Sequence, residues 1–224
     1  MRPVRKEPSP LVVNPADVDA AYDAAQRVVE IHRRLSAWLR IGVTLPKVNR
    51  FVETALDDLG CRSCFRGYRV GQHPPFPSQA CLSVNDCIVH GTAGYYSKPI
   101  ASGDLLKIDI GVTYKGWVGD AVKTYVFGEP SAETLRLTEC GKEATRRGIL
   151  ELQPGRPLVG WRAPSRAVSR ASTDFSACVV SGVTAMAASS TSHPTSPTRC
   201  PKTKTTGPMP FCPASPGCCS PSSR

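Results

Sequence analysis

LLKIDIGVTYKGWVGDAVKTYVFGEP, residues 105–130, is the stretch that decides the fold. Apolar and polar residues alternate on both sides of Lys115-Gly116. Two alternating runs separated by a short glycine-containing turn are typical of a β-hairpin. The stretch therefore predicts two antiparallel strands, at about 104–114 and 117–127, joined by a turn at Lys115-Gly116.

Two carboxylates lie within this predicted hairpin. Asp109 stands between Ile108 and Ile110, and Asp120 follows in the second strand. Because the turn lies near the midpoint between them, we expect the two aspartates to face each other across the hairpin. Opposed carboxylates repel and are costly to bury unless a hard cation neutralises them. The pair therefore indicates a metal site, and the alternative is that one aspartate caps a turn while the other is solvated.

A histidine ends a third strand-like run, which covers residues 81–90. His90 is a candidate catalytic group at the end of that run. The alternative is an ordinary surface or core histidine, which is the commoner role for a lone histidine at a strand end.

Three helices are predicted around these strands. The first begins at Asn14-Pro15, an N-cap residue followed by proline, and ends before Gly42. The second begins at Thr44 and ends at Gly60, and the third runs from Ser131 to about residue 152. This order of elements predicts an α+β fold with helices packed on one face of a mostly antiparallel sheet.

Composition changes abruptly after residue 160. Residues 161–224 contain seven Lys and Arg, a single acid at Asp174, and no Leu, Ile or Glu. Such a segment buries too little apolar surface to offset the entropy of ordering it. We expect a disordered Ser/Pro/Cys-rich tail at 158–224 and a disordered N-terminus at 1–13. The tail lacks the interleaved aromatic residues of a nucleic-acid-binding segment, so no specific nucleic acid is expected as a partner.

The chain shows neither a membrane span nor a secretory signal. No apolar run approaches the ~20 residues that a span requires. The first residues, MRPVRKEPSP, have no apolar core after their charges. We therefore expect a cytoplasmic protein whose ten cysteines are mostly free thiols. Cys61 and Cys64 have the spacing of a zinc knuckle, but no second pair follows at a suitable distance.

Three stretches together resemble the type I methionine aminopeptidases, which are metallopeptidases with the pita-bread fold. They are FPSQACLSVNDCIVHG at 76–91, the hairpin at 105–130, and LTECGKEATRRGILELQPG at 137–155. The resemblance extends over about residues 14–155 and implies a partial aminopeptidase domain at 14–157. It also implies the N-terminal half of a pita-bread fold and the hydrolytic removal of the initiator methionine from nascent proteins.

The resemblance assigns roles to individual residues. It implies two divalent metal ions (Co, Mn, Fe or Zn), with Asp109 and Asp120 among their ligands. It implies that His90 contacts the substrate near the scissile bond and that Phe76 and Cys81 line the pocket for the methionine side chain. Asn85 matches a loop that lies near a monovalent cation. The implied partners are the N-terminal methionine of peptides and nascent chains, near the ribosome.

Further functional residues of this family have no counterpart in the chain. The family also uses a His in a G-H-G-x-G segment, a Glu in I-E-P-M, a late Glu, and a second His in H-E-x-P, and none of these segments occurs. With two of five ligands, metal binding is expected to be weak. The chain is therefore expected to be inactive. The alternatives to an aminopeptidase function are an inactive truncated homologue or a module that binds peptides or nascent chains.

A shifted reading frame after about residues 155–160 accounts for the missing segments. We combined the third base of each codon with the first two bases of the next. Four junctions then specify one amino acid each: Met186/Ala187, Met209/Pro210, Phe211/Cys212 and Cys218/Cys219. Around residues 183–197 this frame can spell GHGNGRxxHEPPHVP, and from 215 to the end it can spell PGMLLTIEPM. We therefore interpret the tail as a frameshift product.

Overall fold

The predicted hairpin forms the centre of the sheet. In the computed structural model, which describes residues 14–155, β3 (Leu105–Tyr114) and β4 (Trp117–Val126) pair antiparallel along their full length. Lys115 and Gly116 both have left-handed backbones, with φ of 49° and 84°. A two-residue turn of this kind matches the twist of the strands that it joins.

Two short strands share the other edge of β3. β1 (Arg62–Ser63) pairs with the C-terminal end of β3, and β2 (Cys81–Val84) pairs with its N-terminal half, both antiparallel. The strand predicted over 81–90 is wrong beyond Val84, because Asn85 adopts a left-handed backbone (φ 47°) that ends the strand. Residues 85–90 form a loop instead.

The three predicted helices are confirmed. They are α1 (Pro15–Trp38), α2 (Leu45–Asp58) and α3 (Ala132–Glu151). Helix α1 starts with a capping box, in which the Asp17 N–H donates to Asn14 Oδ1 and the Asn14 N–H donates to Asp17 Oδ2. The Ser131 hydroxyl accepts the N–H of Thr134 and caps α3.

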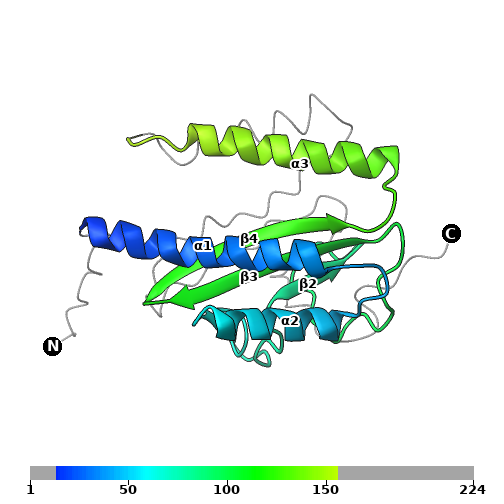
Figure 1. Ribbon diagram of the computed structural model, residues 1–224, viewed down its shortest axis with the longest axis horizontal. Helices are drawn as coiled ribbons and strands as arrows, with labels where there is room; N and C mark the ends of the chain where they lie inside the picture. Colours follow the sequence, from blue (N-terminus) through cyan, green and yellow to red (C-terminus); the bar gives the residue numbers. More distant parts are fainter. Residues whose placement is uncertain (1–13, 156–224) are drawn as a thin grey trace.

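The core lies between the sheet and the first two helices (Figure 1). Every second side chain of β3, from Leu106 to Val112, is fully buried against α1 and α2. These helices contribute the remaining buried aliphatic residues, chiefly Val28, Ile31, Leu35, Val48 and Val52. One sheet face is therefore covered by helices, as the α+β prediction requires.

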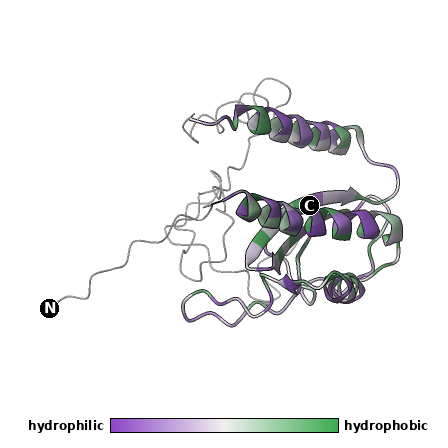
Figure 2. Cartoon of the chain, turned by 60° about the vertical axis from the view of Figure 1, so that its left-hand side comes forward, coloured by the Kyte–Doolittle hydropathy of each residue, from purple (hydrophilic) through white to green (hydrophobic). Residues whose placement is uncertain are grey.

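Helix α3 stands apart from this core, on the side of β4 (Figures 1 and 2). Its buried residues are Cys140 and Gly148, whereas Leu135, Ile149 and Leu150 are at least half exposed. None of the helices in residues 14–155 combines the length and apolar character needed to cross a membrane. The predicted segments 1–13 and 158–224 lie outside the described residues.

Candidate metal centre

Asp109 and Asp120 lie on the same face of the hairpin but are not directly opposed. Asp109 pairs with Val122, and Asp120 pairs with Gly111. The expectation that the aspartates face each other is wrong by two residues, because Asp120 is two residues nearer to the turn than Asp109. They are diagonal neighbours, and since Gly111 has no side chain, both carboxylates reach the same space. Across this space, the negative charge of Asp120 raises the pKa of Asp109.

The alternation of β3 determines which face carries the pair. Ile108 and Ile110 are fully buried in the core, so Asp109 and Gly111 point to the opposite face of the sheet. The carboxylates are therefore on the side away from α1 and α2. Access to them does not pass through the helical layer.

Burial makes the charged form of both carboxyl groups unfavourable. Desolvation is the main cause that raises the pKa of Asp109, and the negative charge of Asp120 raises it further. Desolvation also raises the pKa of Asp120. Two like charges in partly buried surroundings are a strained arrangement that a bound cation would relieve.

An unsatisfied oxygen supports the metal interpretation. Among the described residues, Asp120 Oδ1 is a buried polar atom without a hydrogen-bond partner. Carboxylate oxygens are hard ligands that suit divalent cations. Residues 14–155 contain no cluster of three or more His, Cys, Asp or Glu side chains that could hold a metal. The described part of the chain thus fits a metal with two carboxylate ligands, Asp109 and Asp120.

Cys81 lies beside the carboxylates. It is the partner of Asp109 on β2, and its side chain is buried. Burial raises the pKa of the Cys81 thiol, and the charges of Asp109 and Asp120 raise it further. A neutral thiol here provides an apolar surface next to the pair.

Aromatic side chains continue this apolar surface. Phe76, in the loop before β2, is buried and packs edge-to-face on Phe65, with ring centroids 6.3 Å apart. Phe65 in turn lies over Gly111, where a Cβ atom would stand 2.9 Å from its ring. Phe65 was not predicted from the sequence, because its position depends on how the loop after β1 folds back. The only signal near it was the Cys61–Cys64 pair.

His90 reaches the same region from the loop after β2. Its backbone is left-handed (φ 61°) and lies close enough to Cys81 to lower the pKa of that thiol, against the effect of burial. The next residue, Gly91, accepts the N–H of Leu82 and donates to Ser83 Oγ, which holds the loop against β2. The His90 residue is exposed in this loop, and partial desolvation of its ring lowers its pKa, so the neutral imidazole is favoured near neutral pH. The structure therefore brings Cys81 and both aspartates together, and the backbone of His90 lies near Cys81.

Asn85 holds the start of this loop. Its Oδ1 accepts the N–H of Leu105, its Nδ2 donates to Asp104, and its carbonyl accepts Lys107 Nζ at 2.6 Å. Lys107 lies on the same strand and face as Asp109, two residues away. The Asn85 carbonyl, in the loop that was expected to lie near a monovalent cation, thus binds the ammonium group of Lys107.

Comparison with known proteins places these features in a family. Residues 19–191 match the sequence profile of metallopeptidase family M24. Methionine aminopeptidase B of Synechocystis is 26% identical over 162 residues, which cover 72% of this chain and 59% of that protein. Methionine aminopeptidase of Aquifex aeolicus is 30% identical over 63% of this chain and 55% of its own length. The chain spans somewhat more than half the length of these curated relatives.

Solved structures show the same fold. Methionine aminopeptidase of Thermotoga maritima superposes with a TM-score of 0.65 at 24% identity, over 71% of this chain and 61% of that one. Prolidase of Pyrococcus furiosus superposes with a TM-score of 0.59 at 18% identity, over 72% of this chain and 44% of that one. The expected pita-bread fold, present in part, is confirmed.

Proposed function

The chain belongs to metallopeptidase family M24, and on this premise we propose that it derives from a methionine aminopeptidase whose reaction removes the N-terminal methionine. Asp109 and Asp120 are proposed as two of the ligands of its divalent metal centre. The observation that carries this assignment is the diagonal carboxylate pair with the buried, unpartnered Asp120 Oδ1. The substrates would be peptides and nascent chains in the cytoplasm, near the ribosome.

The residues around the pair have complementary tasks in this reaction. Divalent ions, when bound, supply Lewis-acid activation of water and of the peptide carbonyl. We propose that His90, in the loop after β2, hydrogen-bonds to the substrate where negative charge develops. Cys81 and Phe76, extended by Phe65, form the apolar wall that would hold a methionine side chain. This wall orients the substrate by burying its thioether chain.

We further propose that the remaining ligands are encoded in the shifted frame of the C-terminal segment. In this proposal the 224-residue chain supplies two carboxylate ligands and does not complete the metal centre. Its support is the order of the recovered segments: the G-H-G and H-E segments come first and I-E-P-M comes last, as in the family.

The test compares the chain with a version whose frame is restored by one base after residue 160. Both are incubated with a Met-Ala-Ser peptide and Co²⁺ or Mn²⁺, and free methionine is measured. We expect release by the restored chain, no release by the 224-residue chain, and loss of release in the restored chain carrying Asp109→Asn.

Each part of the proposal has its own contradicting result. Turnover by the 224-residue chain that disappears with Asp109→Asn would refute the incomplete centre but support the function. No turnover by a folded, restored chain would refute the function. A nucleotide sequence that cannot spell the missing segments in any frame would refute the frameshift.

A further inference from the structure

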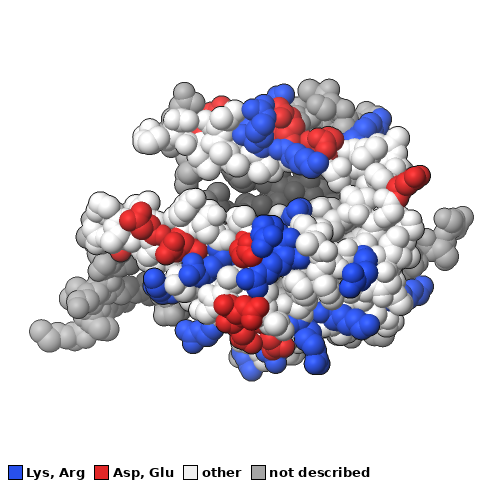
Figure 3. Space-filling model, viewed as in Figure 1, with Lys and Arg blue, Asp and Glu red and all other residues white. Residues whose placement is uncertain are grey.

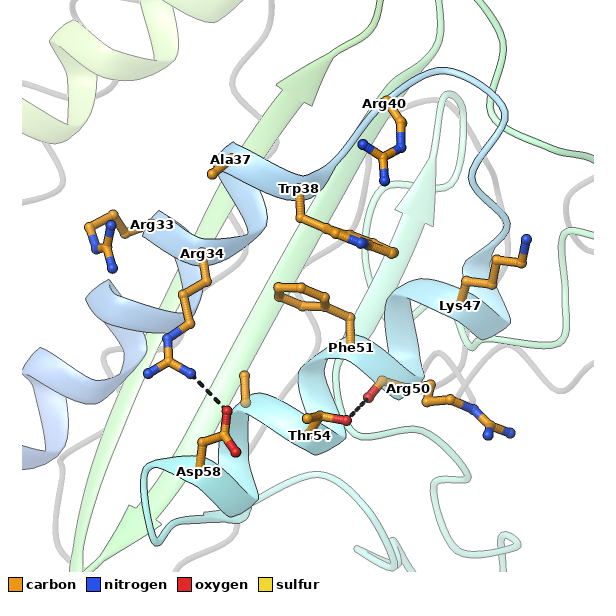
Figure 4. Close-up of a pocket in the computed structure, with 11 residues that line it drawn as sticks. Arg33, Arg34, Ala37, Trp38, Arg40, Lys47, Arg50, Phe51, Thr54 and Asp58 are labelled. Atoms are coloured by element: carbon orange, nitrogen blue, oxygen red, sulfur yellow. Dashed lines mark hydrogen bonds and ion pairs between the residues drawn. The ribbon is translucent and has the colours of Figure 1, made fainter.

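A groove lies between the C-terminal half of α1 and α2, on the solvent side of the helical layer (Figure 4). Its volume is about 710 Å³. Since α1 and α2 cover the sheet face opposite to Asp109 and Asp120, the groove and the candidate metal centre are on different sides of the sheet. An occupant of the groove would leave access to the carboxylates open.

The floor of the groove is apolar. Trp38 from α1 and Phe51 from α2 stack on each other, with ring centroids 4.5 Å apart and planes 23° apart. Ala37 and Ala55 flank them. A groove between two helices, with aromatic and small residues at its floor, is a common binding site for a third helix.

The rim of the groove is strongly basic. Five of its lining residues are cations, whereas Asp58 is the acid among them (Figures 3 and 4). The cations are Arg33, Arg34, Arg40, Lys47 and Arg50.

Three of these cations are not neutralised. Glu30 binds Arg33 and Arg34, and Asp58 also binds Arg34, at 2.7 to 3.0 Å. Within residues 14–155, Arg40, Lys47 and Arg50 form no ion pair. They lie around the end of the groove where α2 begins, and the first turn of α2 holds no acid to offset the positive end of its dipole.

We propose that this groove binds an acidic, amphipathic helix of a partner protein. Apolar side chains of that helix at spacings of three and four residues would fill the floor over Trp38 and Phe51. Carboxylates flanking its apolar stripe would pair with Arg40, Lys47 and Arg50. Charge complementarity at the rim and the apolar floor are both needed for this interaction.

Single-stranded nucleic acid fits the groove less well. Its bases bind proteins by stacking on free aromatic faces along a basic track. Here Trp38 and Phe51 use one face each against the other, and alanines flank them. We therefore treat RNA as a competing outcome of the test.

The test measures fluorescence anisotropy of labelled probes with the full chain. The first probe is a designed 14-residue helix with leucines at positions i, i+3, i+7 and i+10 and glutamates beside them. The other probes are the same peptide with lysine for every glutamate, the acidic peptide with serine for every leucine, and decauridine. We expect the acidic peptide to bind at least about tenfold more tightly than each of the others.

Variants locate the binding. Arg40→Glu/Arg50→Glu should weaken the acidic peptide by at least about tenfold and strengthen the lysine peptide, because the rim changes sign. The matched control Lys142→Glu, an exposed position on α3, should change affinity less than about twofold. Equal binding of the acidic and lysine peptides, tighter binding of decauridine, or an effect of Lys142→Glu equal to that of the groove variant would overturn the proposal. No metal is present in this test, so its result is independent of the proposed aminopeptidase function.

Discussion

Without a bound cation, the charges of Asp109 and Asp120 destabilise the fold. A bound cation would offset this cost. Burial raises the pKa of both groups, which means that the folded chain binds their protons more tightly than the unfolded chain does. Without metal, their contribution to stability is therefore favourable at low pH. It is lost as pH rises from about 4, the ordinary value for Asp, through the raised pKa.

Asp109→Asn tests this cost directly. Replacing one carboxylate with an amide removes the repulsion and the charge that burial penalises. We expect the free energy of unfolding to increase by about 1–2 kcal/mol at pH 8 in the presence of a chelator, with little change at pH 4. Urea unfolding at the two pH values is the measurement.

The matched control is Asp19→Asn, an exposed aspartate on α1. This substitution should leave the free energy of unfolding nearly unchanged at both pH values. Destabilisation of the Asp109→Asn chain at pH 8 would show that the carboxylate is satisfied by the protein itself, contrary to our account.

At the scale of secondary-structure elements, His32 joins α1 to β4. The side chain is 7% exposed, Nδ1 lies 2.9 Å from the Tyr125 hydroxyl, and Nε2 lies 3.1 Å from the Ala121 carbonyl oxygen. Burial lowers the pKa of His32, so the neutral ring is the form that holds the two elements together. Its contribution is complete above the unfolded value of about 6.5 and is lost as pH falls through the lowered pKa.

His32→Gln should therefore destabilise the chain in a pH-dependent way. We expect a loss of about 1–3 kcal/mol at pH 8. The loss should be smaller at pH 5, because there the histidine of the unfolded chain is protonated and the native chain has already lost part of the stability that the neutral ring provides. Urea unfolding across this pH range gives the difference in the free energy of unfolding between the variant and the native chain, which is the contribution of the His32 side chain. His73→Gln, in an exposed loop, should show no such difference, and a loss that is the same at pH 5 and pH 8 would contradict a buried neutral imidazole.

The loop that carries His90 depends on a glycine. A Cβ atom at Gly91 would overlap the carbonyl oxygen of Leu82 and approach the Tyr95 ring at 2.8 Å, so the loop packs against β2 only without a side chain there. Gly91→Ala should lower the free energy of unfolding by at least about 2 kcal/mol and expose the amides of residues 85–91 to hydrogen exchange.

Gly94→Ala is the matched control for this loop. A Cβ atom at Gly94 meets no atom within 4 Å, so this variant should remain within about 0.5 kcal/mol of the native chain. Equal exchange of residues 85–91 in the two variants would show that the close approach of Gly91 to Leu82 does not hold the loop.

At the scale of the whole molecule, the features that depend on neighbouring residues were predicted better than the features that depend on contacts between distant segments. The hairpin and the three helices follow from alternation, caps and glycines, which are properties of neighbouring residues. The offset of Asp109 from Asp120 follows from the predicted turn, because Asp109 is six residues before Lys115 and Asp120 is four residues after Gly116. The expectation that they face each other overlooked this count, and the alternation did not reveal the error because a shift of two residues leaves it unchanged. The end of β2 at Val84 and the packing of Phe65 over Gly111 depend on contacts between distant segments, which no local pattern encodes.

The central claim is that Asp109 and Asp120 bind divalent metal on the sheet face opposite to α1 and α2. Titration of the 224-residue chain with Mn²⁺, followed by the EPR signal of the free ion, tests it most directly. We predict weak binding, with a Kd of about 1 mM, that weakens at least about tenfold in Asp109→Asn and equally in Asp120→Asn, and that Asp19→Asn leaves unchanged. Mn²⁺ binding of the same strength in all four proteins would contradict the claim.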